Sequence, residues 1–163
     1  YRSFDVPVGI LRPFNTYGPR QSMRAIIPTI ITQLLTRDVV ELGNLSPRRD
    51  LTFVKDTVQG FLAMATEDVP FGQPINIGNG KDISIGELLE LLKEITGSSA
   101  TLKTDRDRIR PEKSEVNRLL ASNEKASDLM SWTPKYSLRE GLKETVTWIE
   151  ENIDAFRSDE YHI

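Results

Sequence analysis

A polar segment follows an apolar stretch near the start of the chain. Residues 6–11 are almost entirely apolar, and the next nine residues place Asn15, Thr16 and Tyr17 between two arginines. Ligands of open parallel sheets bind at the carboxyl ends of strands, so a loop that leaves a buried strand is a candidate binding site. The same residues also fit a turn-rich connection with solvated arginines, and spacing alone leaves both interpretations open.

A second candidate site is the tetrapeptide Pro47-Arg48-Arg49-Asp50. An arginine at the start of a strand can present its guanidinium as a bidentate fork to a phosphate, and Asp50 could orient that fork. An exposed Arg49–Asp50 pair that contributes little to stability explains the same residues, and spacing alone favours it.

A third candidate contains three alternating arginines, Arg106, Arg108 and Arg110, with Glu115 a few residues on. Alternate positions could line one side of an extended segment. Guanidinium groups suit the phosphates of a nucleotide diphosphate, and a carboxylate suits the hydroxyls of its ribose. A solvated charged face is the competing interpretation.

Composition argues against several classes of site. The 163 residues contain no cysteine and a single histidine, His162, which argues against thiolate chemistry, His-based triads and a metal site. The net charge of −3 argues against a nucleic-acid-binding surface. The sequence has no apolar run of about 18 residues and no secretory signal pattern. We therefore expect a cytoplasmic globular protein that binds neither nucleic acid nor membranes.

Glycine-rich phosphate loops do not occur in the sequence. Neither the Gly-x-Gly-x-x-Gly pattern nor the Gly-x-x-x-x-Gly-Lys-Ser/Thr pattern is found. The tripeptide Gly78-Asn79-Gly80 matches only a fragment of such a loop, and a turn is the simpler interpretation.

The hydrophobic pattern predicts the elements that would position these residues. The apolar run at 6–11 is typical of a strand buried on both faces of a parallel sheet. Shorter strands are predicted over residues 39–42, 49–53, 74–77 and 101–103. Apolar spacing predicts helices over residues 25–36, 56–66, 85–96, 123–130 and 138–152. Helices that alternate with short strands indicate an α/β fold.

Capping residues mark the predicted helix starts. Ser84 with Glu87 and Ser137 with Glu140 form capping boxes. Asp56 is expected to cap the helix that begins there. The inner face of that helix is predicted to consist of Val58, Phe61, Leu62 and Ala65.

Several separated segments, in order along the chain, resemble one family, the extended short-chain dehydrogenase/reductases that act on nucleotide sugars. Residues 11–21 resemble the loop after the sixth Rossmann strand of that family, and residues 42–45 and 49–56 resemble its next block. Further similar segments are residues 75–78, Arg110-Pro111 with Glu115-Val116, residues 119–126, residues 132–134 and the helix of residues 142–149. The closest resemblance is to nucleotide-sugar 4,6-dehydratases of the GDP-mannose and UDP-N-acetylglucosamine types.

The resemblance covers the carboxyl-terminal half of the family fold. The family's glycine-rich NAD loop, catalytic Ser/Thr and Tyr-x-x-x-Lys motif do not occur in these residues, and Asp5 stands four residues after Tyr1, where that motif has lysine. The resemblance therefore implies that residues 1–163 form an α/β substrate-binding lobe with one leftover Rossmann strand. The amino-terminal NAD-binding part would be absent, and no catalytic residue is expected in this chain.

The same resemblance implies a nucleotide-diphosphate sugar as the ligand. The implied substrate-binding residues are Asn15, Leu42, Gly43, Arg49, Arg110 and Glu115. Asn15 and Arg49 would lie at the pyrophosphate, Arg110 would also contact phosphate, and Glu115 would contact the ribose. NAD would be bound mainly by the absent half, with Pro13 and Phe14 near the nicotinamide.

For the full enzyme the resemblance implies a 4,6-dehydratase that oxidises C4 of the hexose, eliminates water across C5–C6 and reduces C6. A C4 epimerase of the same family and a non-catalytic nucleotide-sugar-binding fragment are the alternatives. The full enzyme is expected to be a homodimer or larger. Because the strand at 6–11 would lack sheet neighbours, we expect its apolar surface to be exposed and to promote self-association.

Overall fold

A computed structural model describes residue 1, residues 3–105 and residues 116–155 of the chain. The strands are β1 (Ile10–Pro13), β2 (Asn15–Tyr17), β3 (Val39–Leu42), β4 (Arg48–Phe53), β5 (Pro74–Ile77), β6 (Asp82–Ser84), β7 (Thr101–Thr104) and β8 (Arg118–Leu119). The helices are α1 (Ile26–Thr36), α2 (Val54–Thr66), α3 (Ile85–Thr96), α4 (Glu124–Met130) and α5 (Leu138–Glu151), followed by a 3-10 turn at Ile153–Ala155. The predicted α/β class is confirmed, and β2, β6 and β8 are strands that the sequence did not predict.

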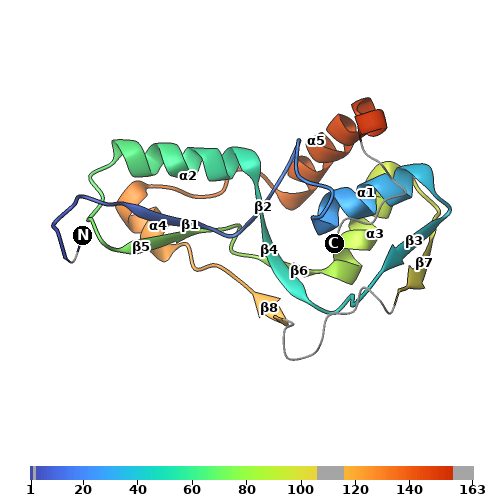
Figure 1. Cartoon of the computed structure of the whole chain (residues 1–163), viewed down its shortest axis with the longest axis horizontal. Helices are drawn as coiled ribbons and strands as arrows, with labels where there is room; N and C mark the ends of the chain where they lie inside the picture. The colour runs from blue at the N-terminus through green and yellow to red at the C-terminus, as the bar shows by residue number, and fades with distance from the viewer. Residues whose placement is uncertain (2, 106–115, 156–163) are drawn as a thin grey trace.

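The strands form three small sheets in an elongated molecule (Figure 1). At one end β1 and β5 pair in parallel, with Leu11 opposite Ile75. At the other end β3 and β7 also pair in parallel. Between them, β4 pairs in parallel with β2 and β8 and antiparallel with β6. Strand β4 is therefore the central strand of the middle sheet.

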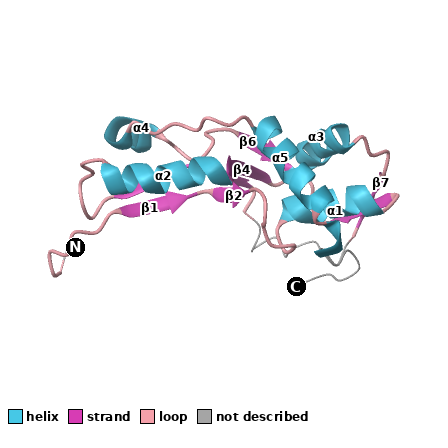
Figure 2. Ribbon diagram, turned by 90° about the horizontal axis from the view of Figure 1, so that it is seen from above, coloured by secondary structure: helices cyan, strands magenta, loops and turns pink. Residues whose placement is uncertain are grey.

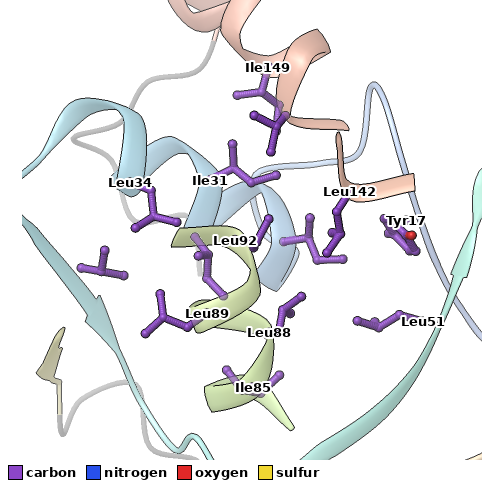
Figure 3. Packing of buried hydrophobic residues seen from close by; sticks show 14 of the residues in the cluster. Tyr17, Ile31, Leu34, Leu51, Ile85, Leu88, Leu89, Leu92, Leu142 and Ile149 are labelled. Atoms are coloured by element: carbon purple, nitrogen blue, oxygen red, sulfur yellow. The ribbon is translucent and has the colours of Figure 1, made fainter. Parts of the chain in front are cut away.

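The larger hydrophobic core lies between α1, α3 and α5 (Figures 2 and 3). Apolar residues at helical spacing turn toward one another from the three helices: Ile27, Ile30, Ile31 and Leu34 of α1, Leu88, Leu89 and Leu92 of α3, and Leu142, Val146 and Ile149 of α5. Full burial of each such side chain contributes roughly 1.5–3 kcal/mol. This core supports the ends of β2, β3 and β4, where polar side chains gather.

Both predicted capping boxes are confirmed. The Ser84 hydroxyl accepts a hydrogen bond from the Glu87 amide, and the Glu87 carboxylate accepts one from the Ser84 amide. Ser137 and Glu140 make the same pair of contacts at the start of α5. These short-range bonds satisfy amides that have no partner within a helix.

The predicted inner face of α2 is wrong. Val58, Phe61 and Leu62 each expose half or more of their surface, and Ala65 is also exposed. The buried face of α2 instead consists of small and polar residues, and at Gly60 an added Cβ would lie 2.5 Å from Ile77 Cδ1. The apolar period identifies a stripe on a helix, but only packing decides which stripe faces the sheet.

The predicted cap at Asp56 is also wrong, because α2 begins at Val54, two residues earlier. The buried Asp56 carboxylate accepts hydrogen bonds from the amides of Lys135, at 2.9 Å, and Tyr136, at 3.1 Å. Its main-chain oxygen accepts one from Trp132 Nε1 at 3.1 Å. Asp56 therefore anchors the segment between α4 and α5 rather than its own helix.

The first strand differs from its prediction in position and burial. Ladder pairing begins at Ile10 and continues through Pro13, whereas residues 6–9 make no strand. Val6 is 51% exposed and Val8 39%, which agrees with the expected exposure of this apolar segment. Within the described part of the chain β1 pairs only with β5. Arg12 and Pro13 of this strand are exposed, so the expected burial on both faces is not found. Self-association stays a prediction.

Candidate functional site

A pocket of about 450 Å³ opens where β2, β3 and β4 meet the start of α1. Four of the residues expected in a substrate site line it: Asn15, Leu42, Gly43 and Arg49. These residues are up to 34 positions apart in the sequence, and the parallel pairing of β2 with β4 brings the first and last together. The pocket therefore joins the first two candidate segments into one site.

Asn15 stands at the start of β2, directly opposite Leu51 of β4. Its side-chain amide donates a hydrogen bond to the main-chain oxygen of Asp50 at 3.2 Å. The neighbouring Thr16 hydroxyl lies 2.9 Å from the Thr57 hydroxyl of α2. Strand β2 is thus held on β4 by its ladder and by the Asn15 side chain, and on α2 by Thr16, which fixes the wall that carries Asn15.

Leu42 and Gly43 line the pocket at the end of β3. Leu42 is buried in the larger core, so its side chain anchors the end of the strand. Asn44 also lines the pocket, and its side-chain oxygen accepts a hydrogen bond from the Ser46 amide at 3.0 Å. This short turn places main-chain polar groups beside the pocket, where they can contact a planar or polar ligand group.

Arg49 lines the pocket from β4 together with Leu51, two positions on along the same strand face. Its Nη1 donates to the main-chain oxygens of Arg48, at 3.0 Å, and of Val116, at 2.6 Å. The guanidinium is therefore held at the edge of the pocket by two carbonyl groups. A guanidinium in this position could make a charge-assisted contact to a phosphate.

The Asp50 carboxylate does not bond the Arg49 guanidinium directly, and the two residues do not form an exposed pair. Asp50 is fully buried, and its carboxylate accepts hydrogen bonds from the amides of Asn79, Gly80 and Ala121. Adjacent residues of a strand point to opposite faces, which separates Asp50 from its neighbour. Both interpretations of this pair made from the sequence are corrected by its strand geometry.

The turn at residues 78–80 is confirmed as a turn rather than a phosphate loop. Its three amides are bound inside the protein: the amide of Gly78 donates to Asn123 Oδ1, and those of Asn79 and Gly80 donate to Asp50. Gly80 has a φ of 75°, a left-handed conformation that favours glycine. An internal carboxylate therefore occupies the place where a phosphate loop would hold its ligand.

Tyr17 lines the pocket but is a structural residue. Its hydroxyl donates to the main-chain oxygen of Leu138 at 3.2 Å, and its ring packs near Phe53 in the core. Burial, together with the negative charges of Asp56 and Glu144, raises the pKa of Tyr17 far above its usual value. The hydroxyl therefore stays protonated and is unsuited to proton transfer near neutral pH.

The remaining expected residues fall into two groups. Pro13 is exposed at the end of β1, and Phe14, whose amide donates to Ile77 at 2.9 Å, is partly buried; neither lines the pocket. Arg110 and Glu115, like Arg106 and Arg108, lie outside the described residues. The roles assigned to all of them stay predictions.

The sequence did not predict several other residues of the pocket wall, and the two most polar are Gln21 and Arg24. The Gln21 amide nitrogen donates to the Thr16 main-chain oxygen at 3.0 Å, while its oxygen is buried with no hydrogen-bond partner in the described structure. Both residues precede α1 in a segment without periodicity, so no local pattern marks them. Among the described residues no group of His, Cys, Asp and Glu could hold a metal ion, and no helix is long and apolar enough to cross a membrane.

An ion network braces the strand that carries Arg49. The Asp82 carboxylate of β6 accepts from Arg118 of β8 and from Arg48 of β4, the latter at 2.7 Å, and Arg48 also contacts Glu87 at 2.9 Å. The hydrogen bonds from Arg118 and then Arg48 lower the pKa of Asp82 below its usual value. Stability from this network is therefore present above the unfolded-state pKa of about 4 and is lost as the pH falls through the lowered folded value.

Replacement of Asp82 by asparagine is expected to lower the free energy of unfolding at pH 7, with a difference from wild type that shrinks below about pH 4. Urea unfolding at a series of pH values measures this difference. Asp68→Asn, at an exposed position after α2, controls for the change of charge alone. A difference that stays constant from pH 7 to pH 3 would contradict the role of the network.

Comparison with known proteins decides the family. A family model described as GDP-mannose 4,6 dehydratase matches residues 1–145. The chain belongs to the NAD-dependent nucleotide-sugar epimerase/dehydratase family. It is 31% identical over 158 residues to the UDP-glucuronate 4-epimerase of Thermodesulfobacterium geofontis, covering 95% of this chain and 47% of that protein. It is also 31% identical over 165 residues to the dTDP-D-glucose 4,6-dehydratase of Mus musculus, covering 98% and 46%.

A solved structure of the epimerase/dehydratase family shows the same fold. The UDP-glucuronic acid 4-epimerase of Bacillus cereus, in complex with UDP-glucuronic acid and NAD, aligns with a TM-score of 0.84 at 31% identity, covering 93% of this chain and 48% of that one. The chain thus spans about half the length of the relatives it matches. The predicted fold class, part of an extended Rossmann-type reductase, is confirmed.

Proposed function

We propose that this chain is the substrate-binding part of an NAD-dependent nucleotide-sugar 4,6-dehydratase and that its pocket holds the nucleotide diphosphate. The observation that carries the proposal is the meeting of Asn15, Leu42, Gly43 and Arg49 around one pocket. The family model, which describes a 4,6-dehydratase and matches most of the chain, favours this reaction.

Different residues are proposed to contact different parts of the ligand. Arg49 supplies a fixed positive charge for the pyrophosphate, and the exposed Asn15 adds an uncharged hydrogen-bonding group beside it. The turn after Leu42 places main-chain groups where a base or ribose can be recognised. Arg110 at the phosphates and Glu115 at the ribose complete the proposed ligand set.

We place NAD mainly on a second part of a family-length protein. The proposed reaction oxidises the sugar at C4, removes water across C5–C6 and reduces C6, with NAD supplying the redox chemistry when bound. The 163 residues contain neither a glycine-rich NAD loop nor Tyr-x-x-x-Lys, so we place both on the other part. Pro13, exposed at the end of β1, and Phe14 beside it would face the nicotinamide.

Exposed apolar surface at one end of the molecule supports the proposal that a second, NAD-binding part packs against this chain. Val58, Phe61 and Leu62 of α2 form a stripe at helix-packing spacing, and Val6 and Val8 are exposed before β1. Strand β1 has a single partner strand among the described residues. Since short parallel sheets are normally covered on both faces, we assign this end to contact with the NAD-binding part.

C4 epimerisation is a second candidate reaction. Two similar proteins favour it: the Thermodesulfobacterium relative is named a UDP-glucuronate 4-epimerase, and the Bacillus cereus structure is that of a UDP-glucuronic acid 4-epimerase. The two reactions share oxidation at C4 and differ only in the steps after that oxidation. NMR analysis of the product, after this chain is joined to a family NAD-binding part, separates a 4-keto-6-deoxy sugar from a C4 epimer.

Calorimetric titration tests nucleotide binding by the 163-residue protein directly. UDP, GDP and dTDP are each compared with the nucleoside that lacks the phosphates. At least one diphosphate is expected to bind about tenfold or more tightly than its nucleoside, because charge-assisted phosphate contacts are the strongest that the pocket offers. If none of the three diphosphates shows saturable binding, the proposal is overturned.

A further inference from the structure

We infer that Asp50 is a positioning residue for the nucleotide site: its buried carboxylate joins β4 to two other segments and so holds the neighbouring Arg49 toward the pocket. The inference rests on the proposed function of that pocket. Asp50 does not itself line the pocket and would act only through residues that do.

The Asp50 carboxylate contacts two segments that are remote in sequence. Oδ1 accepts from the Asn79 amide at 2.6 Å, and Oδ2 accepts from the amides of Gly80, at 2.9 Å, and Ala121, at 3.1 Å. Asp50 is fully buried. A buried carboxylate that receives three amide hydrogen bonds forms a stiff junction, because loss of any one leaves a desolvated polar group.

The segment anchored at Ala121 is the one that holds Arg49. Strand β8 pairs with β4, with Leu119 opposite Arg49, and the Arg48 amide donates to the Asn117 main-chain oxygen at 2.8 Å. Arg49 Nη1 in turn donates to the Val116 oxygen at 2.6 Å. One end of this segment is therefore fixed by Asp50, and the other end holds the guanidinium.

Further contacts connect Asp50 to the pocket wall and to the turn at residues 78–80. Its main-chain oxygen accepts the hydrogen bond from Asn15, the other polar residue proposed for the pyrophosphate. The Asn123 side chain holds both the amide and the carbonyl of Gly78, at 2.9 and 2.8 Å. An added Cβ at Gly78 would lie 2.9 Å from Asp50 Oδ2, so the turn must approach the carboxylate closely.

Asp56 provides a matched control. It is also a buried aspartate whose carboxylate accepts hydrogen bonds from main-chain amides, those of Lys135 and Tyr136. Unlike the Asp50 carboxylate, it does not bond the segment that holds Arg49. Asn substitution at either site replaces one accepting oxygen with an NH₂ group that cannot accept. Both variants are therefore expected to lose stability, and only one is expected to lose phosphate affinity.

The first test is titration of UDP and uridine into wild type, Asp50→Asn and Asp56→Asn at a temperature where circular dichroism shows all three folded. Asp50→Asn is expected to weaken UDP binding about five- to thirtyfold and uridine binding far less. Asp56→Asn is expected to leave both within about twofold. UDP affinity of Asp50→Asn equal to wild type, or equal losses for UDP and uridine, would overturn the inference.

A double mutant tests whether Asp50 acts through Arg49. If it does, Arg49→Ala combined with Asp50→Asn binds UDP no more weakly than Arg49→Ala alone. Each single substitution would then lower the affinity through the same contact, that of Arg49 with the phosphates of UDP. Losses that multiply would show that Asp50 acts by another route. If Asp50→Asn does not fold, Asn123→Ala is the milder variant: it loosens Gly78 of the same turn and is expected to weaken UDP binding at least about twofold. Unchanged UDP affinity in that variant would overturn the inference.

Hydrogen exchange in the ligand-free protein separates this inference from the proposed function. Asp50→Asn is expected to accelerate exchange of the Ala121 and Leu119 amides by about tenfold or more relative to wild type, and Asp56→Asn is not. A wild-type protein that binds no diphosphate would contradict the proposed function alone. Unchanged exchange at both amides in Asp50→Asn would overturn the positioning role.

Discussion

Arg49→Ala is expected to weaken binding of a UDP or GDP sugar about 10- to 150-fold. The substitution removes a charge-assisted contact to the pyrophosphate, a loss of about 1.5–3 kcal/mol. Arg49 is held at the pocket edge by the carbonyl groups of Arg48 and Val116, so little of its rotational freedom would be lost on binding. Arg49→Lys should recover only part of the affinity, since a point charge cannot reproduce the bidentate fork.

Calorimetric titration of wild type and both Arg49 variants measures this effect, first in this chain and then with an NAD-binding part present. Arg12→Ala, at an exposed position in β1 outside the pocket, is the control for loss of a positive charge. It is expected to change the affinity by less than about twofold. Equal affinities in wild type and the Arg49 variants would remove Arg49 from the site.

Gly141→Ala is expected to destabilise the protein by about 1–3 kcal/mol, even though alanine is the better helix former. Gly141 lies in α5 against β4, and an added Cβ would overlap the Tyr17 hydroxyl and lie 2.8 Å from the Phe53 ring. Both aromatic side chains are buried, and the Tyr17 hydroxyl is bound to Leu138, so neither can move aside cheaply.

Urea unfolding of Gly141→Ala and Gly86→Ala measures the effect of this close approach. At Gly86 in α3 the nearest atom to an added Cβ is 3.6 Å away, an ordinary contact. That substitution is expected to be neutral or to stabilise by up to about 1 kcal/mol. A Gly141→Ala protein as stable as wild type would show that α5 can shift away from β4.

The secondary structure was largely predictable because its determinants are local. Predicted helices at residues 25–36, 85–96 and 138–152 agree with α1, α3 and α5 to within a residue. Their capping boxes and the left-handed Gly97 at the end of α3 depend on residues within a few positions of one another. The short strands β2, β6 and β8 were missed, because a segment of two or three residues is too short to show the alternation of apolar and polar residues that predicts a strand.

The sequence also determined much of the candidate site, through resemblance of separated segments rather than through spacing. Asn15, Leu42, Gly43 and Arg49 were expected together and line one pocket. Spacing alone favoured an exposed Arg49–Asp50 pair, and that interpretation was wrong. Local composition cannot show whether a charged residue is buried, because burial depends on what packs over it.

By itself, then, the sequence determined the α/β class, the helices, the two capping boxes, the family and four of the residues that line the pocket. Only the tertiary structure decided which way the polar residues of β4 and α2 point. Asp50 finds its partners at Asn79, Gly80 and Ala121, and Asp56 finds its own at Lys135 and Tyr136, 29 to 80 positions away. A buried carboxylate must meet amide donors, but which amides reach it depends on how distant segments pack, and no local pattern encodes that.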